Sequence, residues 1–96
     1  MASSIEFRDY ILGQLSELNN ITYRSMMGEF LLYYNGVLFG GIYDNRLLIK
    51  MTNSNAKFNL HTELPYENAK AMYMVENVDD REYLNGLIKD TCKDLK

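Results

Sequence analysis

Apolar residues follow a helical period at both ends of the chain. Near the N-terminus the apolar stripe runs from Phe7 to Leu18 at steps of three and four residues, which predicts a helix over about residues 4–18. Ser3 and Glu6 stand in capping-box spacing at its start, so the hydroxyl and the carboxylate can satisfy backbone N–H groups there.

A second helical stripe lies near the C-terminus. Asp79 and Glu82 have the spacing of a helix cap, and a 3.6-residue period follows them. The apolar face of this second predicted helix comprises Tyr83, Leu84, Leu87, Ile88, Thr91 and Leu95.

Between the two stripes, over residues 21–52, β-branched, aromatic and long aliphatic residues dominate. Asn35-Gly36 and Asp44-Asn45 interrupt this region. Both pairs favour two-residue hairpins, because a type I′ turn requires positive φ at both central positions. The pattern therefore predicts three antiparallel strands joined by tight turns.

Two-residue turns also set the register of these strands by counting, with Leu32 opposite Phe39 and Tyr43 opposite Arg46. One face would then be almost wholly aliphatic, and we expect the helices to pack on it; it carries Leu31, Tyr33, Leu38, Ile42, Leu47, Ile49 and Met51. The opposite face is apolar but more aromatic, and it carries Phe30, Leu32, Tyr34, Val37, Phe39, Tyr43, Arg46, Leu48 and Lys50.

Shorter elements complete the prediction: a strand near residues 22–27, one helical turn near 56–60 and a last strand near 71–76. The expected fold class is α+β. It has two layers, with a mainly antiparallel sheet of about five strands and long N-terminal and C-terminal helices, in the order α-β-β-β-β-short α-β-α. The chain is expected to form a single domain over residues 1–96.

Composition narrows the class of protein. Of the 96 residues, 47% are hydrophobic and 24% are charged, which is typical of a folded globule. The net charge of −3 argues against nonspecific nucleic-acid binding. No apolar run is long enough for a membrane helix, and no secretory signal is recognisable. The single cysteine, Cys92, cannot form an internal disulfide, so we expect a cytoplasmic protein with no membrane association.

Residues that could carry catalysis are sparse. The only histidine, His61, is expected in an exposed loop, and Cys92 is expected to be half-buried on a helix, without a base beside it. Gly40-Gly41 lies inside a predicted strand, where it indicates a bulge or a close approach of another backbone or ring. We therefore expect no enzyme, no cofactor and no metal site.

We expect the aromatic second face to be buried by another segment or molecule, because large apolar patches are seldom exposed to solvent. A helix or the loop over residues 53–70 could cover it, a second copy of the chain could bury it in a homodimer, or its aromatic rings could stack on single-stranded nucleic acid. The homodimer is the favoured reading. The candidate interaction surface comprises Arg24, Met26, Phe30, Tyr34, Phe39, Tyr43, Arg46 and Lys50.

Several short motifs, taken in order, resemble the N-terminal domain of the TfoX/Sxy family of bacterial competence regulators. They are Tyr23-Arg24-Ser25-Met26-Met27-Gly28, Tyr34-Asn35-Gly36, the run from Phe39-Gly40-Gly41 to Lys50, the run from Leu64-Pro65-Tyr66 to Met72, and Val78-Asp79-Asp80. The chain has Met27 where the family often has Phe, and Glu67 to Ala71 where the family often has Pro-Gly-Ala-Lys-Pro.

The resemblance implies a two-layer α+β domain similar to secretion-chaperone-like folds, without catalytic activity. It also implies a cytoplasmic bacterial protein that acts on transcription through a protein partner. The chain is similar to stand-alone members that lack the helical C-terminal domain of full-length regulators.

Overall fold

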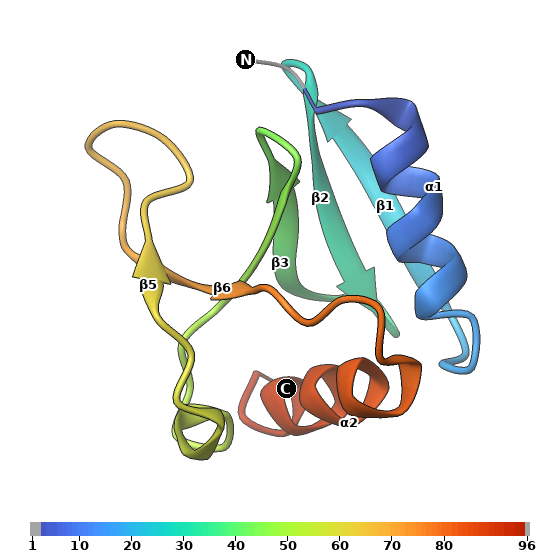
Figure 1. Cartoon of the computed structure of the whole chain (residues 1–96), viewed down its shortest axis with the longest axis vertical. Helices are drawn as coiled ribbons and strands as arrows, with labels where there is room; N and C mark the ends of the chain where they lie inside the picture. Colours follow the sequence, from blue (N-terminus) through green and yellow to red (C-terminus); the bar gives the residue numbers. More distant parts are fainter. Residues whose placement is uncertain (1–2, 96) are drawn as a thin grey trace.

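The structure is a computed structural model that describes residues 3–95. Two helices and six strands occur in it, together with one turn of 3₁₀ helix, η1 (Figure 1). In chain order the elements are α1 (Ile5–Gln14), β1 (Ile21–Met26), β2 (Glu29–Tyr34), β3 (Val37–Tyr43), β4 (Arg46–Ile49), η1 (Ala56–Phe58), β5 (Thr62–Glu63), β6 (Met72–Val75) and α2 (Arg81–Lys93).

All strands belong to one antiparallel sheet in the order β1-β2-β3-β4-β6-β5. The α+β fold with a helix at each end is as predicted. The sheet has six strands rather than about five, because the two-residue strand β5 pairs with the outer side of β6. A strand this short carries no periodicity that the sequence could show.

Both helices begin one residue later than the predicted caps, and α1 ends at Gln14 instead of near residue 18. The Ser4 hydroxyl accepts from the Phe7 N–H at 3.1 Å, and the Asp80 carboxylate accepts from the Tyr83 N–H at 3.1 Å. Ser3 instead donates through its hydroxyl to Glu29 Oε1 at 2.6 Å, which ties the N-terminal segment to the sheet. Among the described residues, neither helix is long and apolar enough to span a membrane.

The hairpin turns form at the predicted positions. Asn35 and Gly36 have φ values of 51° and 79°, and Asp44 and Asn45 have φ values of 53° and 56°. The β3–β4 register is as predicted, with Tyr43 opposite Arg46.

The predicted β2–β3 register was wrong beyond its first two residue pairs. The pairing shifts between Leu32 and Tyr33, so that Leu32 lies opposite Gly40 and Phe30 opposite Ile42. A β-bulge of this kind places one extra residue on one strand and exchanges the faces of the residues beyond it. Phe39 therefore lies on the helix-covered face, and the aliphatic and aromatic faces were assigned the wrong way round on β2 and the first half of β3.

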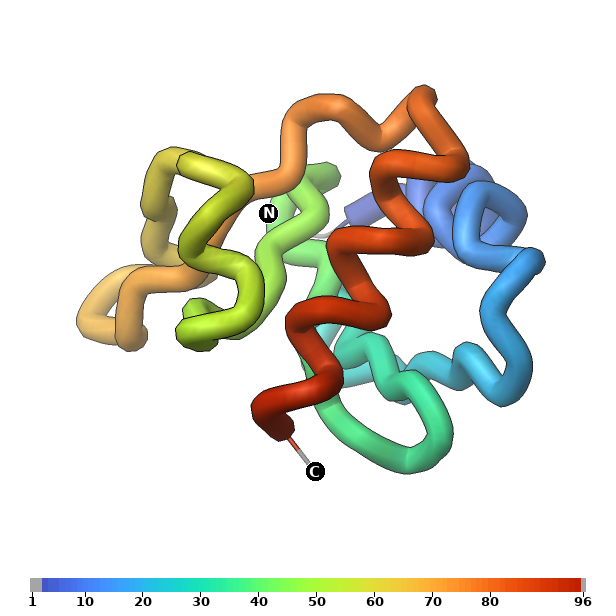
Figure 2. The backbone as a smooth tube through the Cα atoms, turned by 90° about the horizontal axis from the view of Figure 1, so that it is seen from below, coloured from blue at the N-terminus to red at the C-terminus, as the bar shows by residue number. Residues whose placement is uncertain are grey.

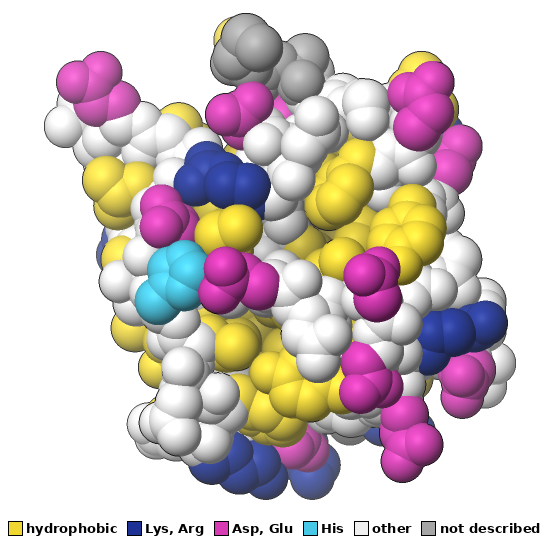
Figure 3. All heavy atoms as spheres, viewed as in Figure 1, with side chains coloured by type: hydrophobic (Ala, Val, Ile, Leu, Met, Phe, Trp, Pro, Cys, Tyr) yellow, Lys and Arg dark blue, Asp and Glu magenta, His cyan; other side chains and the backbone are white. Residues whose placement is uncertain are grey.

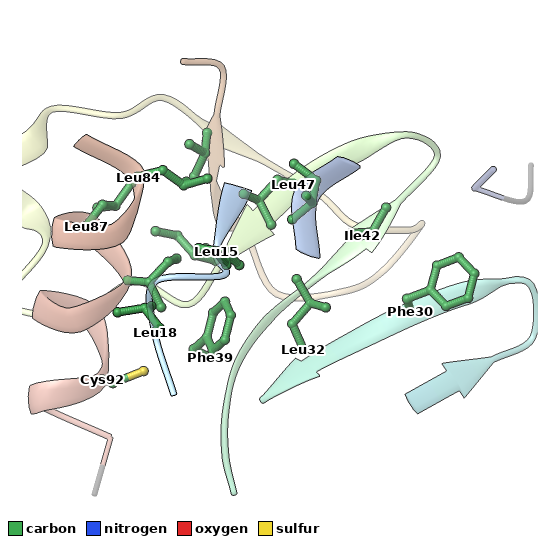
Figure 4. Packing of buried hydrophobic residues seen from close by; sticks show 14 residues of the cluster. Leu15, Leu18, Phe30, Leu32, Phe39, Ile42, Leu47, Leu84, Leu87 and Cys92 are labelled. Carbon is green, nitrogen blue, oxygen red and sulfur yellow. The ribbon is translucent and has the colours of Figure 1, made fainter. Parts of the chain in front are cut away.

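The hydrophobic core lies between the two helices and one face of the sheet. Figure 4 shows side chains of the helical segments and of the sheet turned toward one another, Phe39 and Leu32 among them. The buried apolar residues of this core are Ile11, Leu15, Leu18, Phe30, Leu32, Phe39, Ile42, Leu47, Ile49, Val75, Leu84, Leu87, Ile88 and Cys92. Seen from below, α1 and the segment between β5 and β6 lie at opposite sides of the molecule (Figure 2).

Candidate interaction surfaces

The structure divides the predicted interaction surface between the two faces of the sheet. Phe30 and Phe39 are 6% and 0% exposed and belong to the core, and Tyr34 packs against that core. These three residues cannot form the exposed aromatic platform that we predicted, because the bulge turns them under the helices. The remaining predicted residues, Arg24, Met26, Tyr43, Arg46 and Lys50, lie on the opposite face.

This opposite face, here called the open face, carries no helix. A strap formed by residues 64–71, between β5 and β6, packs over part of it. Between the strap and the sheet lies a groove of about 650 Å³. Its lining is mostly apolar and comprises Leu31, Leu38, Gly40, Tyr43, Lys50, Met51, Pro65, Tyr66, Ala69, Lys70, Ala71 and Met72.

Arg46 fastens the strap to the sheet. Its Nη2 donates to the Leu64 carbonyl at 3.2 Å, and its Nη1 lies 3.5 Å from Glu63 Oε1. Its Nε also donates to the Tyr43 carbonyl at 3.1 Å, which orients the guanidinium along the end of the hairpin. Arg46 is therefore largely occupied in holding the groove together.

Tyr43 lies flat on the open face, beneath the strap. Its ring contacts that of Tyr66 with centroids 6.4 Å apart, and a Cβ on Gly41 would come within 2.8 Å of the Tyr43 ring. The glycine therefore provides the space that the ring occupies. Tyr43 is 6% exposed, and burial raises the pKa of its hydroxyl, with smaller contributions from Tyr66 and Glu29. The hydroxyl consequently stays protonated at neutral pH.

Among residues 3–95, the charged residues that line the groove are two lysines. Neither Lys50 nor Lys70 has an ion-pair partner within residues 3–95, although the chain as a whole is acidic. β4 ends at Ile49, which pairs with Tyr73 of β6, and Lys50 directly follows it. Lys70 lies at the end of the strap, two residues before β6 begins. Both lysines line the groove, and their positions in the chain place them near the end of it where β4 finishes and β6 begins.

The outer edge of β1 forms a second exposed surface. β1 is the first strand of the sheet and pairs on one side only, with β2. The Asn35 N–H donates to the Asn20 carbonyl, and bonding alternates along an antiparallel pair, so the N–H groups of Ile21, Tyr23 and Ser25 point away from β2. All of β1 from position 22 to position 26 is exposed.

The hairpin tip beside this edge presents Met27, which is 99% exposed. Its φ of 51° lies in the left-handed region, where an L-residue without a short polar side chain is strained. Met26 and Ile5, which are also exposed, belong to the same end of the molecule, because the Ser3 N–H bonds the Gly28 carbonyl.

The residues that we considered for catalysis lie apart. His61 is exposed, with its two ring nitrogens 3.4 Å from Glu63 and 3.3 Å from Glu76, and Figure 3 shows the histidine flanked by acidic side chains. Cys92 is buried in the core. No group of three potential metal ligands occurs in the part of the chain that the structure describes.

Sequence reasoning gave the loop over residues 53–70 as one possible cover for the second face of the sheet, but it did not predict the groove beneath the strap. It assigned Leu31 and Leu38 to the helix-covered face, and it treated residues 64–71 as an irregular loop. The signal that could have corrected the faces was Gly40-Gly41. We interpreted this pair as a bulge or a close approach. The bulge lies directly before the pair, at Phe39, and the close approach is at Gly40, where a Cβ would lie 2.2 Å from the Leu48 carbonyl oxygen.

The sequence of this chain matches a known protein and a family model. Over 80 residues the chain is 28% identical to a Spirochaeta aurantia protein described as an uncharacterized 12.7 kDa protein in the trpE 5′ region, and the match covers 81% of this chain and 70% of that protein. The family model of the TfoX N-terminal domain matches residues 13–88, from the second half of α1 to the middle of α2. The chain therefore belongs to the TfoX N-terminal domain family.

Proposed function

We propose that this protein is a non-catalytic regulatory module that works by binding protein, and that it makes its contact through the edge of β1 and the adjoining hairpin tip. The observation that carries the proposal is the six-residue edge strand β1, which is exposed along nearly its whole length. Membership of the TfoX N-terminal domain family supports a regulatory role, and transcription is the process in which we place the partner.

Apart from the charged side chain of Arg24, the edge of β1 lacks the usual protection against strand pairing. Natural edge strands are commonly shortened, bulged, covered, or interrupted by proline or lysine. β1 has the sequence ITYRSM, without proline or lysine, and it pairs with β2 in an unbroken register from Ile21 to Met26. An extended segment could therefore add a strand here, with main-chain hydrogen bonds to the outward N–H and C=O groups.

Met27 supports a contact role for the tip. A fully exposed methionine contributes little to folding, and holding its backbone at positive φ costs on the order of 1 kcal/mol. A flexible thioether side chain at such a position adapts readily to a partner's surface.

A second copy of the chain is the first partner that we propose for this edge. Two β1 strands related by a twofold axis pair in antiparallel fashion, which is the geometry of an isologous dimer. The resulting homodimer would differ from the one that we expected from the sequence, because the aromatic residues of that surface are buried in the core. The same burial removes Phe30 and Phe39 from any stacking platform for single-stranded nucleic acid.

The test is the solution mass by light scattering, for the wild type, Ser25→Pro and Ser25→Thr. The Ser25 N–H points away from β2, so proline removes an outward donor and leaves the β1–β2 hydrogen bonds in place. We expect a dimer for the wild type and for Ser25→Thr. For Ser25→Pro we expect a folded monomer, or a dissociation constant raised at least about tenfold.

Amide NMR spectra of each variant check that the fold is retained. A monomeric wild type at high micromolar concentration would show that β1 does not pair with its own copy. A dimer of unchanged strength in Ser25→Pro would move the interface away from this edge.

A further inference from the structure

The groove on the open face combines three features that the proposed contact at β1 does not use. Its floor is apolar and formed by aliphatic side chains that include Leu31, Leu38 and Met72. Two lysines without ion-pair partners in the described chain stand at one end of it. A nearly buried tyrosine, Tyr43, lies along it.

The volume of the groove suits a small molecule. About 650 Å³ lies within the range of roughly 300–1,000 Å³ that is usual for small-molecule sites. Such sites are mostly apolar, with a few polar groups that fix orientation. The strap that forms one wall is held by Arg46, so the groove exists without a ligand.

The polar side chains that line the groove, those of Lys50, Lys70, Tyr43 and Tyr66, can all donate hydrogen bonds. Lys50 and Lys70 offer ammonium groups at the end where β4 finishes and β6 begins. The Tyr43 hydroxyl makes no hydrogen bond within residues 3–95, although the residue is only 6% exposed. Because the hydroxyl keeps its proton at neutral pH, it can donate to an acceptor in the groove.

The charge of the lining favours a ligand of negative charge. The whole chain carries −3, yet the charged residues facing the groove are both cationic. An apolar surface with cationic donors at one end complements a molecule with an anionic head and an apolar chain. Leu31, Leu38, Met51 and Met72 suit a flexible aliphatic chain better than a flat ring, because methionine side chains adapt to irregular shapes.

We propose that this groove binds a medium-chain aliphatic carboxylate, with the carboxylate between Lys50 and Lys70 and the chain along Leu31, Leu38 and Met72. The site lies on the open face of the sheet, whereas the proposed protein contact lies along the edge of β1. A small amphipathic effector could therefore bind this protein whether or not β1 pairs with a partner.

The experiment uses decanoate and decyltrimethylammonium, which share one chain length and carry opposite charges, each below its micelle concentration. Binding is followed by amide chemical shifts of the labelled wild-type protein and by isothermal titration calorimetry. We expect decanoate to shift the amides of Leu31, Leu38, Lys50 and Ala71. We expect decyltrimethylammonium to bind at least about tenfold more weakly, because its head meets the lysines.

Variants separate the head group site from the apolar floor. Lys50→Met with Lys70→Met is expected to weaken decanoate binding about tenfold. The matched control, Lys89→Met with Lys93→Met, removes the same charge from α2, outside the groove lining, and is expected to leave the affinity unchanged. Ala71→Trp, at an exposed position in the lining, is expected to abolish binding of both probes by filling the groove.

Several outcomes would overturn the proposal. Decanoate shifts that map outside the groove would place the ligand elsewhere, and equal affinity for the two probes would exclude a carboxylate site. Unchanged decanoate binding in Lys50→Met with Lys70→Met would show that the lysines do not bind the carboxylate. Ser25→Pro is expected to bind decanoate like the wild type, so failure of the β1 contact and failure of this site are distinguishable.

Discussion

Gly40 lies where the backbones of β3 and β4 approach more closely than a side chain allows. A Cβ there would lie 2.2 Å from the Leu48 carbonyl oxygen and 2.9 Å from the Ile49 Cα, which are both backbone atoms. Because neither atom can move without displacing β4, Gly40→Ala is expected to lower the free energy of unfolding by about 2–3 kcal/mol or more. Urea unfolding followed by circular dichroism measures the loss.

The control for this prediction is the same substitution in α2. Gly86 is exposed, and a Cβ there would meet nothing within 4 Å. Gly86→Ala is therefore expected to raise the free energy of unfolding by up to about 1 kcal/mol, through helix propensity alone. If the two alanines had effects of the same sign, the close approach at Gly40 would not govern the local structure.

At the scale of the element, the bulge determines which residues of β3 face the core. Leu38 lies in the groove and Phe39 in the core, the reverse of the faces that a regular β2–β3 register gives them. Phe39→Ala is expected to cost about 3–5 kcal/mol, because it opens a cavity beneath the helices. Leu38→Ala is expected to cost about 1 kcal/mol or less, since its side chain is only half-buried.

Urea unfolding of the two variants, compared side by side, measures the difference. The regular register that we first predicted gives the reverse order, with Leu38 under the helices and Phe39 on the open face. A larger loss for Leu38→Ala would therefore contradict the bulge.

The elements themselves could largely be predicted from the sequence. Both helices, the Asn35-Gly36 and Asp44-Asn45 turns and the β3–β4 register have local causes, namely apolar period, capping side chains and residues that tolerate positive φ. The β2–β3 bulge has a tertiary cause. Gly40 permits it, but the packing of Phe39 under the helices is what places it.

At the scale of the whole molecule, charged contacts join α2 to the segment after β4. Asp90 lies 3.2 Å from Lys57 Nζ and 3.1 Å from Lys93 Nζ, and hydrogen bonds from Lys93 and Lys57 lower the pKa of its carboxyl below the ordinary 3.8. A carboxyl whose pKa is lower in the folded state stabilises that state above its unfolded pKa. This stabilisation disappears as the pH falls through the folded pKa.

The pH profile of Asp90→Asn tests this linkage. At pH 7 the free energy of unfolding of the variant is expected to be about 0.5 kcal/mol lower than that of the wild type, which is typical of a partly exposed ion pair. The difference is expected to shrink as the pH falls below 3.8 and through the lowered folded-state pKa of Asp90, because the wild-type carboxyl then becomes protonated too. Glu67→Gln, whose carboxylate has no ion pair among the described residues, serves as the control. A stability difference that persists unchanged at pH 2 would exclude the ionised carboxyl as its source.

The surfaces of the whole molecule were the hardest to predict. Of the eight residues of the predicted interaction surface, Phe30 and Phe39 proved to be core residues, whereas Tyr43 and Lys50 do line the groove. Nothing local to residues 64–71 shows that they fold over the sheet. Their position depends on Arg46, which lies far from them in the sequence and bonds the Leu64 carbonyl.

The sequence by itself determined the α+β class, the helices, the tight turns and the family motifs, because each depends on side chains and backbone preferences within a few residues. Only the tertiary structure decided which face of the sheet the helices cover, where the strap lies and which edge stays unpaired. Those features depend on contacts between distant segments. A single extra residue in β3 is enough to exchange the two faces of a strand whose side chains alternate with a period of two.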